Sequence, residues 1–278
     1  MHNQSTMISF RTRKNSIKMK CEINLQELLP ANERQRFDDN WRDFRKSPPC
    51  NKRIYPHDSK GDKLTYFSEQ LIPVKENNRP SLLFVLGNPA SHSVDAGMFF
   101  SFEADGREHR FWKDILRPAL YLPIDNNLSV QKRNAERRKQ LLNLNYGPQI
   151  RIGLCVFISM PSAASGPWSG VAGIQKLIGA KALERLEKKE SKRVILCAKE
   201  FISSGGAVVA FQKNAWDALK ADKNPSYSLK LAMKGKLVGT LKDLPQVPFF
   251  CVPPTRYAKA ASQVLHKIVS KFLQTQQS

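Results

Sequence analysis

From about residue 80 onward, the chain alternates between short apolar runs and stretches with apolar residues at helical spacing. The apolar runs are bounded by turn-forming residues, which is typical of buried strands, and they cover 82–87, 151–158, 207–211 and 248–252. The helical spacing predicts helices over 109–122, 171–202, 213–222 and 257–273. Strands that alternate with helices favour a mostly parallel sheet covered on both faces. The pattern therefore predicts an α/β domain.

The first 79 residues follow a different pattern. Residues 24–46 mix apolar and charged residues at helical spacing, which predicts a helix, and residues 46–63 are rich in turn formers, which predicts a long loop. Residues 1–20 carry basic residues and no acidic one, which favours a flexible basic tail, with an organelle transit peptide as the alternative. We therefore expect a tail over 1–20, a helix and loop over 21–79 packed on the domain edge, and the α/β domain over 80–278.

The charge of the chain is strongly positive. Its 45 Lys and Arg residues against 24 Asp and Glu residues give a formal net charge of +21. Such an excess favours polyanionic partners such as nucleic acid, either DNA or RNA. The basic run "QKRNAERRKQ" at 131–140 could contact successive phosphates of a nucleic acid, although a solvated helix face explains this run equally well.

Several classes of protein are disfavoured by the sequence. The five cysteines are scattered without a C-x-x-C pair, so neither a disulfide framework nor a zinc ribbon is expected, and most should be reduced core residues. The chain has no phosphate-binding G-x-x-x-x-G-K-[ST] loop. No apolar run approaches the roughly 20 residues of a membrane span, and the first residues lack the apolar core of a secretory signal. We expect no membrane association, no metal and no cofactor. We also expect a location in the cytoplasm, associated with the nucleoid, or in the nucleus, and not a secreted protein.

The first apolar run ends abruptly at Gly87, Asn88 and Pro89. In open α/β sheets, ligands bind beyond the carboxyl ends of the strands, and Asn88 would lie at such a position. Asparagine before proline also commonly begins a turn, with its side chain bonded to local backbone. Asn88 is therefore a candidate functional residue with a structural alternative.

The residues around Asn88 resemble a known family. "LLFVLGNPAS" followed by "GMFFSFEADGREHRFWKDIL" resembles the first motif region of the uracil-DNA glycosylase superfamily, and most closely its mismatch-specific uracil glycosylase branch. "GAVVAFQKNAWDAL" is similar to the third core strand and following helix of that family. The resemblance covers roughly residues 80–273.

This resemblance implies a three-layer α/β/α fold with a central four-stranded, mostly parallel sheet. It also implies a monomeric enzyme of base excision repair, which hydrolyses the N-glycosidic bond of a flipped uracil or mismatched pyrimidine. Asn88 would position a water molecule and contribute a dipole. Pro89 and Ala90 would lie against the base, with the backbone N–H groups that follow Pro89 facing a base oxygen, and Phe99 or Phe100 would stack on the flipped ring.

The sequence departs from the family at two motifs. The second motif of the family ends in His-Pro-Ser or Asn-Pro-Ser, whereas this chain has Pro253, Pro254 and Thr255, so a side-chain donor to the departing base is missing. The family also commonly places an asparagine after the second strand, where Ser159 is the polar candidate here.

The residues after the second motif are candidates for DNA contact. Arg256 and Tyr257 stand where the family inserts a wedge into the duplex, and Thr255 and Lys259 complete this DNA-binding group. The rival interpretation is a catalytically weak or silent member of the fold that only binds DNA or RNA. A third, an enzyme acting on small nucleotides, fits the fold but not the charge.

Other features near the proposed site leave two interpretations open. His92 and His109 would either donate to a base or a phosphate, or simply pack in their loops. The segment "SAASGPWSG" at 162–170 would either contact nucleic acid or form a plain connection closed by a packed Trp168.

Overall fold

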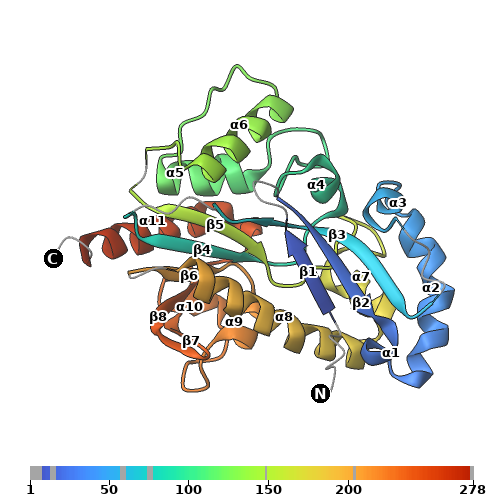
Figure 1. Cartoon of the computed structure of the whole chain (residues 1–278). Coiled ribbons are helices and arrows are strands. Elements are labelled where there is room, and N and C mark those ends of the chain that lie inside the picture. Colours follow the sequence, from blue (N-terminus) through green and yellow to red (C-terminus); the bar gives the residue numbers. More distant parts are fainter. Residues whose placement is uncertain are drawn as a thin grey trace. The chain divides into compact units, whose positions relative to one another are not determined.

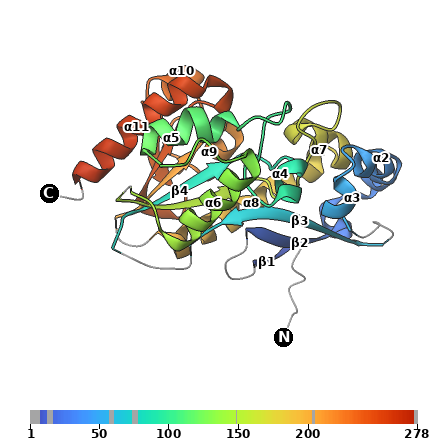
Figure 2. The ribbon, with the colours of Figure 1, turned by 90° about the horizontal axis from the view of Figure 1, so that it is seen from above.

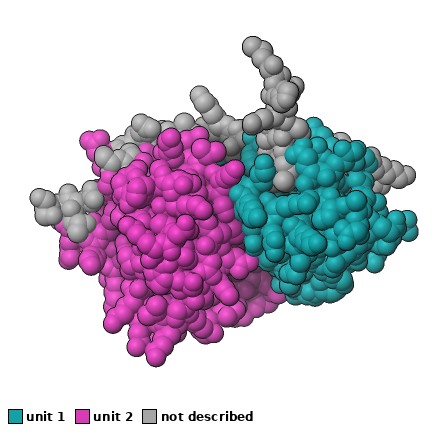
Figure 3. Space-filling model, turned by 90° about the horizontal axis from the view of Figure 1, so that it is seen from below, with its two compact units in different colours: residues 1–70, 88–99, 158–190 teal, residues 71–87, 100–157, 191–278 magenta. Residues whose placement is uncertain are grey.

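The structure is a computed structural model (Figure 1), and it describes residues 8–12, 17–56, 61–73, 78–147, 149–202 and 205–275. Over these residues the chain is an α/β protein with a mixed eight-stranded sheet, and about half of it is helical. It divides into two compact units, shown in Figure 3. Unit 1 comprises residues 1–70, 88–99 and 158–190, and unit 2 comprises 71–87, 100–157 and 191–278.

Unit 1 combines antiparallel strands with short helices. Its strands are β1 (Ile8–Thr12), β2 (Lys18–Asn24) and β3 (Lys63–Leu71), of which Leu71 is assigned to unit 2. β2 pairs with both of the others in antiparallel register. The helical segments are α1 (Leu25–Leu28), η1 (Ala31–Glu33), α2 (Arg34–Lys46), α3 (Asn51–Ile54), α4 (Ser91–Ala96) and α7 (Gly170–Ile178).

An aromatic cluster forms the core of unit 1. Helix α2 buries Phe37, Trp41 and Phe44, which lie on one helical stripe at i, i+4 and i+7. The Trp41 ring stacks on Phe37 at 5.3 Å between centroids, and Phe44 meets Trp168 edge to face at 5.8 Å. This stripe explains why the helix predicted over 24–46 forms, although α1 and η1 interrupt its first part.

The N-terminal region differs from the flexible tail expected over 1–20. Ile8–Thr12 and Lys18–Asn24 are paired strands, and residues 1–7 and 13–16 lie outside the described part. The reason is visible in β2, where Met19 and Cys21 are buried while Lys18 and Lys20 point to solvent. The basic side chains therefore occupy the solvent side of a strand with period-two alternation. β3 was also absent from the elements predicted for this region.

Unit 2 contains the four strands expected from the apolar runs. They are β5 (Arg151–Val156), β4 (Ser81–Leu86), β6 (Ala207–Ala210) and β8 (Leu244–Cys251), adjacent in that order and parallel. Every residue of β4, β5 and β6 is buried, as expected for interior parallel strands. A short antiparallel strand, β7 (Val238–Leu241), pairs with β8.

The prediction of a four-stranded, mostly parallel sheet is therefore wrong in the number and the direction of the strands. The four parallel strands are present, but the described residues contain eight strands of mixed direction. The additional strands escaped prediction because they lack continuous apolar runs: β7, for example, is short and only its last residue is buried.

Helices pack on both sides of the unit 2 strands. The segments are η2, a π-helix (Phe111–Leu116), α5 (Arg117–Leu120), α6 (Val130–Asn143), α9 (Lys213–Leu219), α10 (Leu229–Met233), η3 (Thr255–Tyr257) and α11 (Ala258–Thr275). Figures 1 and 2 show α5 and α6 together on one side of β4 and β5. On β5, Gly153 leaves room for the ring of Phe201, the last residue of α8 (Ala180–Phe201).

The single helix expected over 171–202 is divided in two. Helices α7 and α8 meet at Gly179, whose φ of 87° lies in a region that favours glycine.

All five cysteines are free thiols, and four of them are buried. Among the described residues, no helix combines the length and apolar character needed to cross a membrane.

Candidate active site

Asn88 follows β4 and is held by a loop of unit 1. Its Nδ2 donates to Ser162 Oγ at 2.7 Å and, at 3.4 Å, to the carbonyl oxygen of Pro89. Because a carbonyl only accepts hydrogen bonds, this second contact sets which end of the amide is the nitrogen. Among the described residues, none donates a hydrogen bond to the amide oxygen of Asn88, which is partly exposed. That oxygen is therefore an available acceptor on a fixed side chain.

The backbone next to Asn88 is fixed by the same loop. Ser162 N–H donates to Pro89 O at 3.1 Å, and Ser91 N–H donates to Ser162 O at 2.8 Å. Ala90 and Ser162 thus form an isolated parallel bridge. The N–H of Ser91 is one of the groups that were expected to face a base oxygen. Because it already donates to Ser162 O within unit 1, it is occupied.

The loop that holds Asn88 is closed by Trp168. Ala163 N–H donates to the carbonyl of Trp168 at 3.1 Å, and the side chain of Trp168 is only 5% exposed. Lys176 Nζ lies 4.2 Å from the centroid of the indole ring. Of the two interpretations of residues 162–170, the packed-tryptophan connection matches these contacts, and it makes the loop a rigid support for Asn88.

Ser159 lies in the core of unit 1, which differs from the expectation that it faces a base. It is fully buried, its N–H donates to Glu190 Oε1 at 2.7 Å, and its Oγ bonds to the same carboxylate. The hydroxyl of Tyr66 lies 2.6 Å from Ser159 Oγ. Burial raises the pKa of Tyr66 well above its usual value, so this phenol stays protonated. These contacts do not support a base-contacting role for Ser159.

The two candidate stacking residues have different environments. Phe99, in unit 1, is fully buried, whereas Phe100, in unit 2, is partly exposed. Phe100 has a φ of 46°, a conformation that is a genuine outlier for a bulky residue. Its ring lies 4.6 Å from the His109 ring and 4.5 Å from the Phe111 ring. Phe100 is thus the better-placed aromatic, and its strained backbone is typical of ligand-contacting positions.

His109 packs against Phe100 and is held in one orientation. The N–H of Phe111 donates to Nδ1 of His109 at 3.1 Å, so in the neutral ring the proton is on Nε2. Nε2 lies 3.9 Å from Glu103 Oε1. His92 lies on α4, partly buried, in the other unit.

Gln212 is a candidate that the sequence interpretation missed. It lies two residues beyond the end of β6, it is exposed, and a Cβ added to Gly87 would lie 2.2 Å from its Nε2. Gln212 therefore covers the carboxyl end of β4 within unit 2, where only a glycine leaves room for it. The signal was available, because a polar amide immediately after a buried strand is the feature that singled out Asn88.

The expected DNA-binding residues lie at the carboxyl end of β8 in unit 2. Pro253 is buried, Thr255 begins the short helix η3, and Arg256 and Lys259 are exposed. The guanidinium of Arg256 lies 5.1 Å from the centroid of the Tyr257 ring, which is 36% exposed. This arrangement presents cationic and aromatic surface to solvent next to a strand end.

The described residues include no cluster of three or more His, Cys, Asp or Glu side chains that could hold a metal ion. A scan against protein-family models finds no match to this chain, and neither does a comparison with curated protein sequences.

Proposed function

We propose that the protein is a DNA glycosylase that hydrolyses the N-glycosidic bond of a flipped uracil or mismatched pyrimidine. The observation that carries the proposal is Asn88, an amide fixed by Ser162 at the end of a buried strand with its oxygen open. The motif resemblance around it and the four adjacent parallel strands in unit 2 support the same proposal. We also propose that these strands correspond to the α/β/α core of the uracil-DNA glycosylase fold.

In this mechanism Asn88 positions the attacking water. Hydrolysis requires a water molecule held below the sugar while a cationic sugar and an anionic base develop. An amide is too weak a base to remove a proton early, but its oxygen accepts one hydrogen bond from the water and orients it. The bond from Asn88 Nδ2 to Ser162 holds the side chain, and the contact of the same nitrogen with the Pro89 carbonyl, which only accepts, keeps the oxygen and the nitrogen from exchanging places.

Within unit 2, Phe100 and Gln212 offer side chains that suit a pyrimidine base. A partly exposed ring supported by His109 and Phe111 provides a face on which a pyrimidine can stack, worth about 1–3 kcal/mol. The carboxamide of Gln212 offers both a donor and an acceptor, as the edge of uracil requires. Gln212 would then contact the edge of the base, a role for which the family commonly uses an asparagine after the second strand and for which this chain has none after β5.

The group of Thr255, Arg256, Tyr257 and Lys259, in which all but Thr255 are exposed, would hold the DNA backbone. Cationic side chains at this position suit phosphate contact, and Tyr257 suits insertion beside a base step. Pro253 and Pro254, in contrast, provide no side-chain donor to the departing base. Loss of one such donor costs about 10²–10³ in rate, so the enzyme is expected to be slow.

A binding protein without catalysis is the second candidate function. It is favoured by the same Pro253 and Pro254, since the positively charged surface survives where the anion-stabilising donor is missing. The partner would again be DNA, with RNA as the alternative.

The test is excision of a single uracil. Purified protein would be incubated with oligonucleotides carrying one uracil, either single-stranded or opposite guanine, and alkali would reveal abasic sites. We expect strand cleavage that falls about 10²–10³-fold in Asn88→Ala. Asn40→Ala is the matched control, because among the described residues the Asn40 amide bonds only to Arg36 O of its own helix.

Cleavage that is equal in Asn88→Ala and wild type would contradict the enzymatic proposal. Salt-sensitive DNA binding without any excision would favour the binding protein instead.

A further inference from the structure

Tyr121 is an exposed tyrosine of unit 2 with an unusual backbone conformation. It ends helix α5 with a φ of 50° and a ψ of 41°, which lie in the left-handed region. Glycine is the usual residue at such a helix end, because a side chain is strained in this conformation. Tyr121 is 73% exposed, so burial of its ring compensates little of the strain. A strained residue that adds little to the core is typical of ligand-contacting positions.

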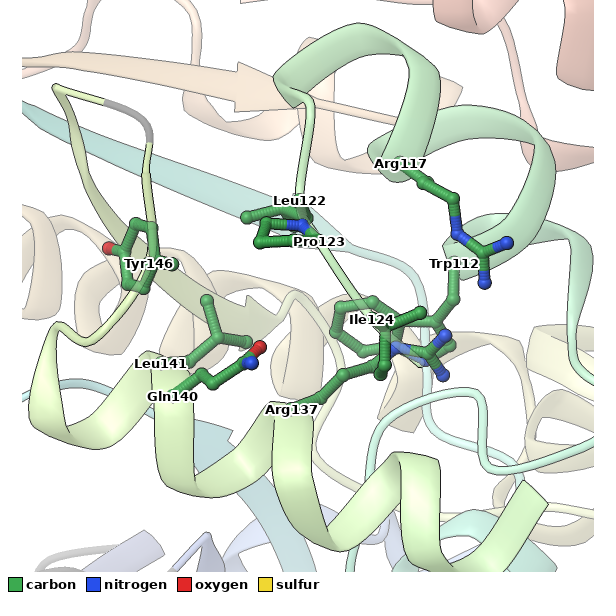
Figure 4. Close-up of a pocket in the computed structure, with 9 residues that line it drawn as sticks. All are labelled: Trp112, Arg117, Leu122, Pro123, Ile124, Arg137, Gln140, Leu141 and Tyr146. Carbon is green, nitrogen blue, oxygen red and sulfur yellow. The ribbon is translucent and has the colours of Figure 1, made fainter. Parts of the chain in front are cut away.

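The chain around Tyr121 is held on both sides. The last residues of α5 before it are buried. Residues 122–124 after it line a small hollow together with Leu141 of helix α6, and Figure 4 shows them crossing beside this helix. The backbone of Tyr121 is therefore set by the packing of its neighbours, which keeps the ring in one place on the surface.

His266 of helix α11 supports the ring of Tyr121. The two rings meet edge to face, with 5.8 Å between their centroids and 82° between their planes. Nδ1 of His266 lies 3.4 Å from the carbonyl oxygen of Ala119 in α5, and since a carbonyl only accepts, Nδ1 is the donor. Figures 1 and 2 show α5 and α11 side by side. Tyr121 is thus a fixed aromatic ring next to the exposed face of α11.

The exposed face of α11 is basic. Lys259, Lys267 and Lys271 are exposed on this helix, and the exposed Arg256 lies just before it in η3. The sequence has no Asp or Glu over 244–278. Within the described part of the chain, none of these four cations lies in ion-pair distance of a carboxylate. Four positive charges without a local counter-charge favour a polyanionic partner.

We propose that this region binds single-stranded DNA. The choice of DNA among polyanions rests on the proposed function, whereas the choice of a single strand rests on Tyr121. An exposed ring stacks on a base only when that base is unpaired, because in a duplex the base faces are covered by their neighbours. The cationic side chains would contact the phosphates of the same strand. The binding region, here named the α11 surface, consists of Tyr121, Arg256, Lys259, His266, Lys267 and Lys271.

The role of Tyr121 is tested with a substitution that suits the fold. Tyr121→Gly relieves the left-handed strain, so its melting temperature should equal or exceed that of wild type. Its affinity for a labelled oligothymidine, measured by fluorescence anisotropy, should fall about 5- to 150-fold, as expected for the loss of one stacked base. Tyr121→Phe keeps the ring and should bind within about twofold of wild type. Leu196→Ala is the matched control, since Leu196 is an apolar residue of α8 that is 58% exposed.

The strand state and the charges are tested with the same method. A duplex of the oligothymidine with its complement should bind Tyr121→Gly within about twofold of wild type, because it offers no unpaired base. Lys267→Gln should reduce the slope of log K against log salt for the single strand by about 0.7. Lys192→Gln, at an exposed lysine of α8, is the control and should keep the slope of wild type.

Two outcomes would overturn the single-strand assignment. One is wild-type affinity of Tyr121→Gly for oligothymidine, since the ring then stacks on no base. The other is an equal loss of single-strand and duplex binding in this variant. Tighter binding of oligouridine RNA than of oligothymidine, with the same dependence on Tyr121, would overturn the choice of DNA. The DNA probe contains no uracil and Asn88 is unchanged, so failure of this binding and failure of uracil excision appear in separate experiments.

Discussion

At the scale of single residues, the proposed chemistry depends on how the Asn88 amide is oriented. Ser162 Oγ accepts from Asn88 Nδ2 at 2.7 Å and can donate to the carbonyl of Ala163 at 3.4 Å. The Ser162 hydroxyl thus accepts from the Asn88 nitrogen and donates to the Ala163 carbonyl. Its donor is therefore not used on the Asn88 oxygen, which stays open. Ser162 is a positioning residue in this scheme, since it acts through Asn88.

Ser162→Ala is expected to lower the rate of uracil excision about tenfold, because a misplaced water reacts poorly. The turnover number should fall while KM stays nearly unchanged, as measured by gel-based excision kinetics. Ser162→Thr, which keeps the hydroxyl, should restore most of the rate, and Ser165→Ala, on an exposed part of the same loop, should behave as wild type. A change confined to KM would argue against the positioning role.

At the scale of elements, the loop at 162–170 is held against helix α7. A Cβ added to Gly173 would lie 2.2 Å from the carbonyl carbon of Trp168, which is backbone and cannot move without the loop. The support of Asn88 therefore depends on a close approach between a helix and a loop. Only glycine permits it.

Gly173→Ala is expected to destabilise the protein by about 1–3 kcal/mol through overpacking. In an uncrowded helix the same change would stabilise the protein by about 0.4–1 kcal/mol. The sign of the change in the free energy of unfolding therefore distinguishes a crowded Gly173 from an uncrowded one. Urea unfolding followed by circular dichroism provides the measurement. Gly147→Ala serves as control, because no atom lies within 4 Å of the added Cβ, and it should stay within about 0.5 kcal/mol of wild type.

At the scale of the whole molecule, the net charge of +21 would dominate the proposed encounters with nucleic acid. Neutralising phosphates releases counterions, so affinity falls with salt in proportion to the number of contacts. Exposed cations at Arg256 and Lys259 are candidates for such contacts.

Duplex binding measured by fluorescence anisotropy should weaken by about 10³–10⁵ between 50 and 200 mM salt if 6–10 phosphates are contacted. Lys259→Gln should reduce the slope of log K against log salt by about one. Lys20→Gln is the control, because Lys20 Nζ is already paired with Glu22 at 2.8 Å, and its slope should match that of wild type. A slope near zero in wild type would exclude DNA as a charge-driven partner.

The local pattern of the sequence determined the interior strands and most helices. β4, β5 and β6 were predicted because strands that are buried on both faces must be apolar throughout, and such runs are visible without knowing their neighbours. β8, which is only partly buried, was predicted from the apolar run at its carboxyl end. The position of Asn88 after β4 followed from the same reasoning, since a polar residue that ends an apolar run marks a strand end.

Tertiary structure alone decided what these residues contact. Ser159 was predicted beside a base but bonds to Glu190, 31 residues away, and the pairing of β1 with β2 depends on a partner strand that periodicity does not show. Glu108 meets Arg133 and Arg137 only because a π-helix, a loop and α6 bring them together. Hydrogen bonds and ion pairs depend on distances of a few ångströms between residues far apart in the chain. A hydrophobic pattern, which records burial but not partners, contains no such distances.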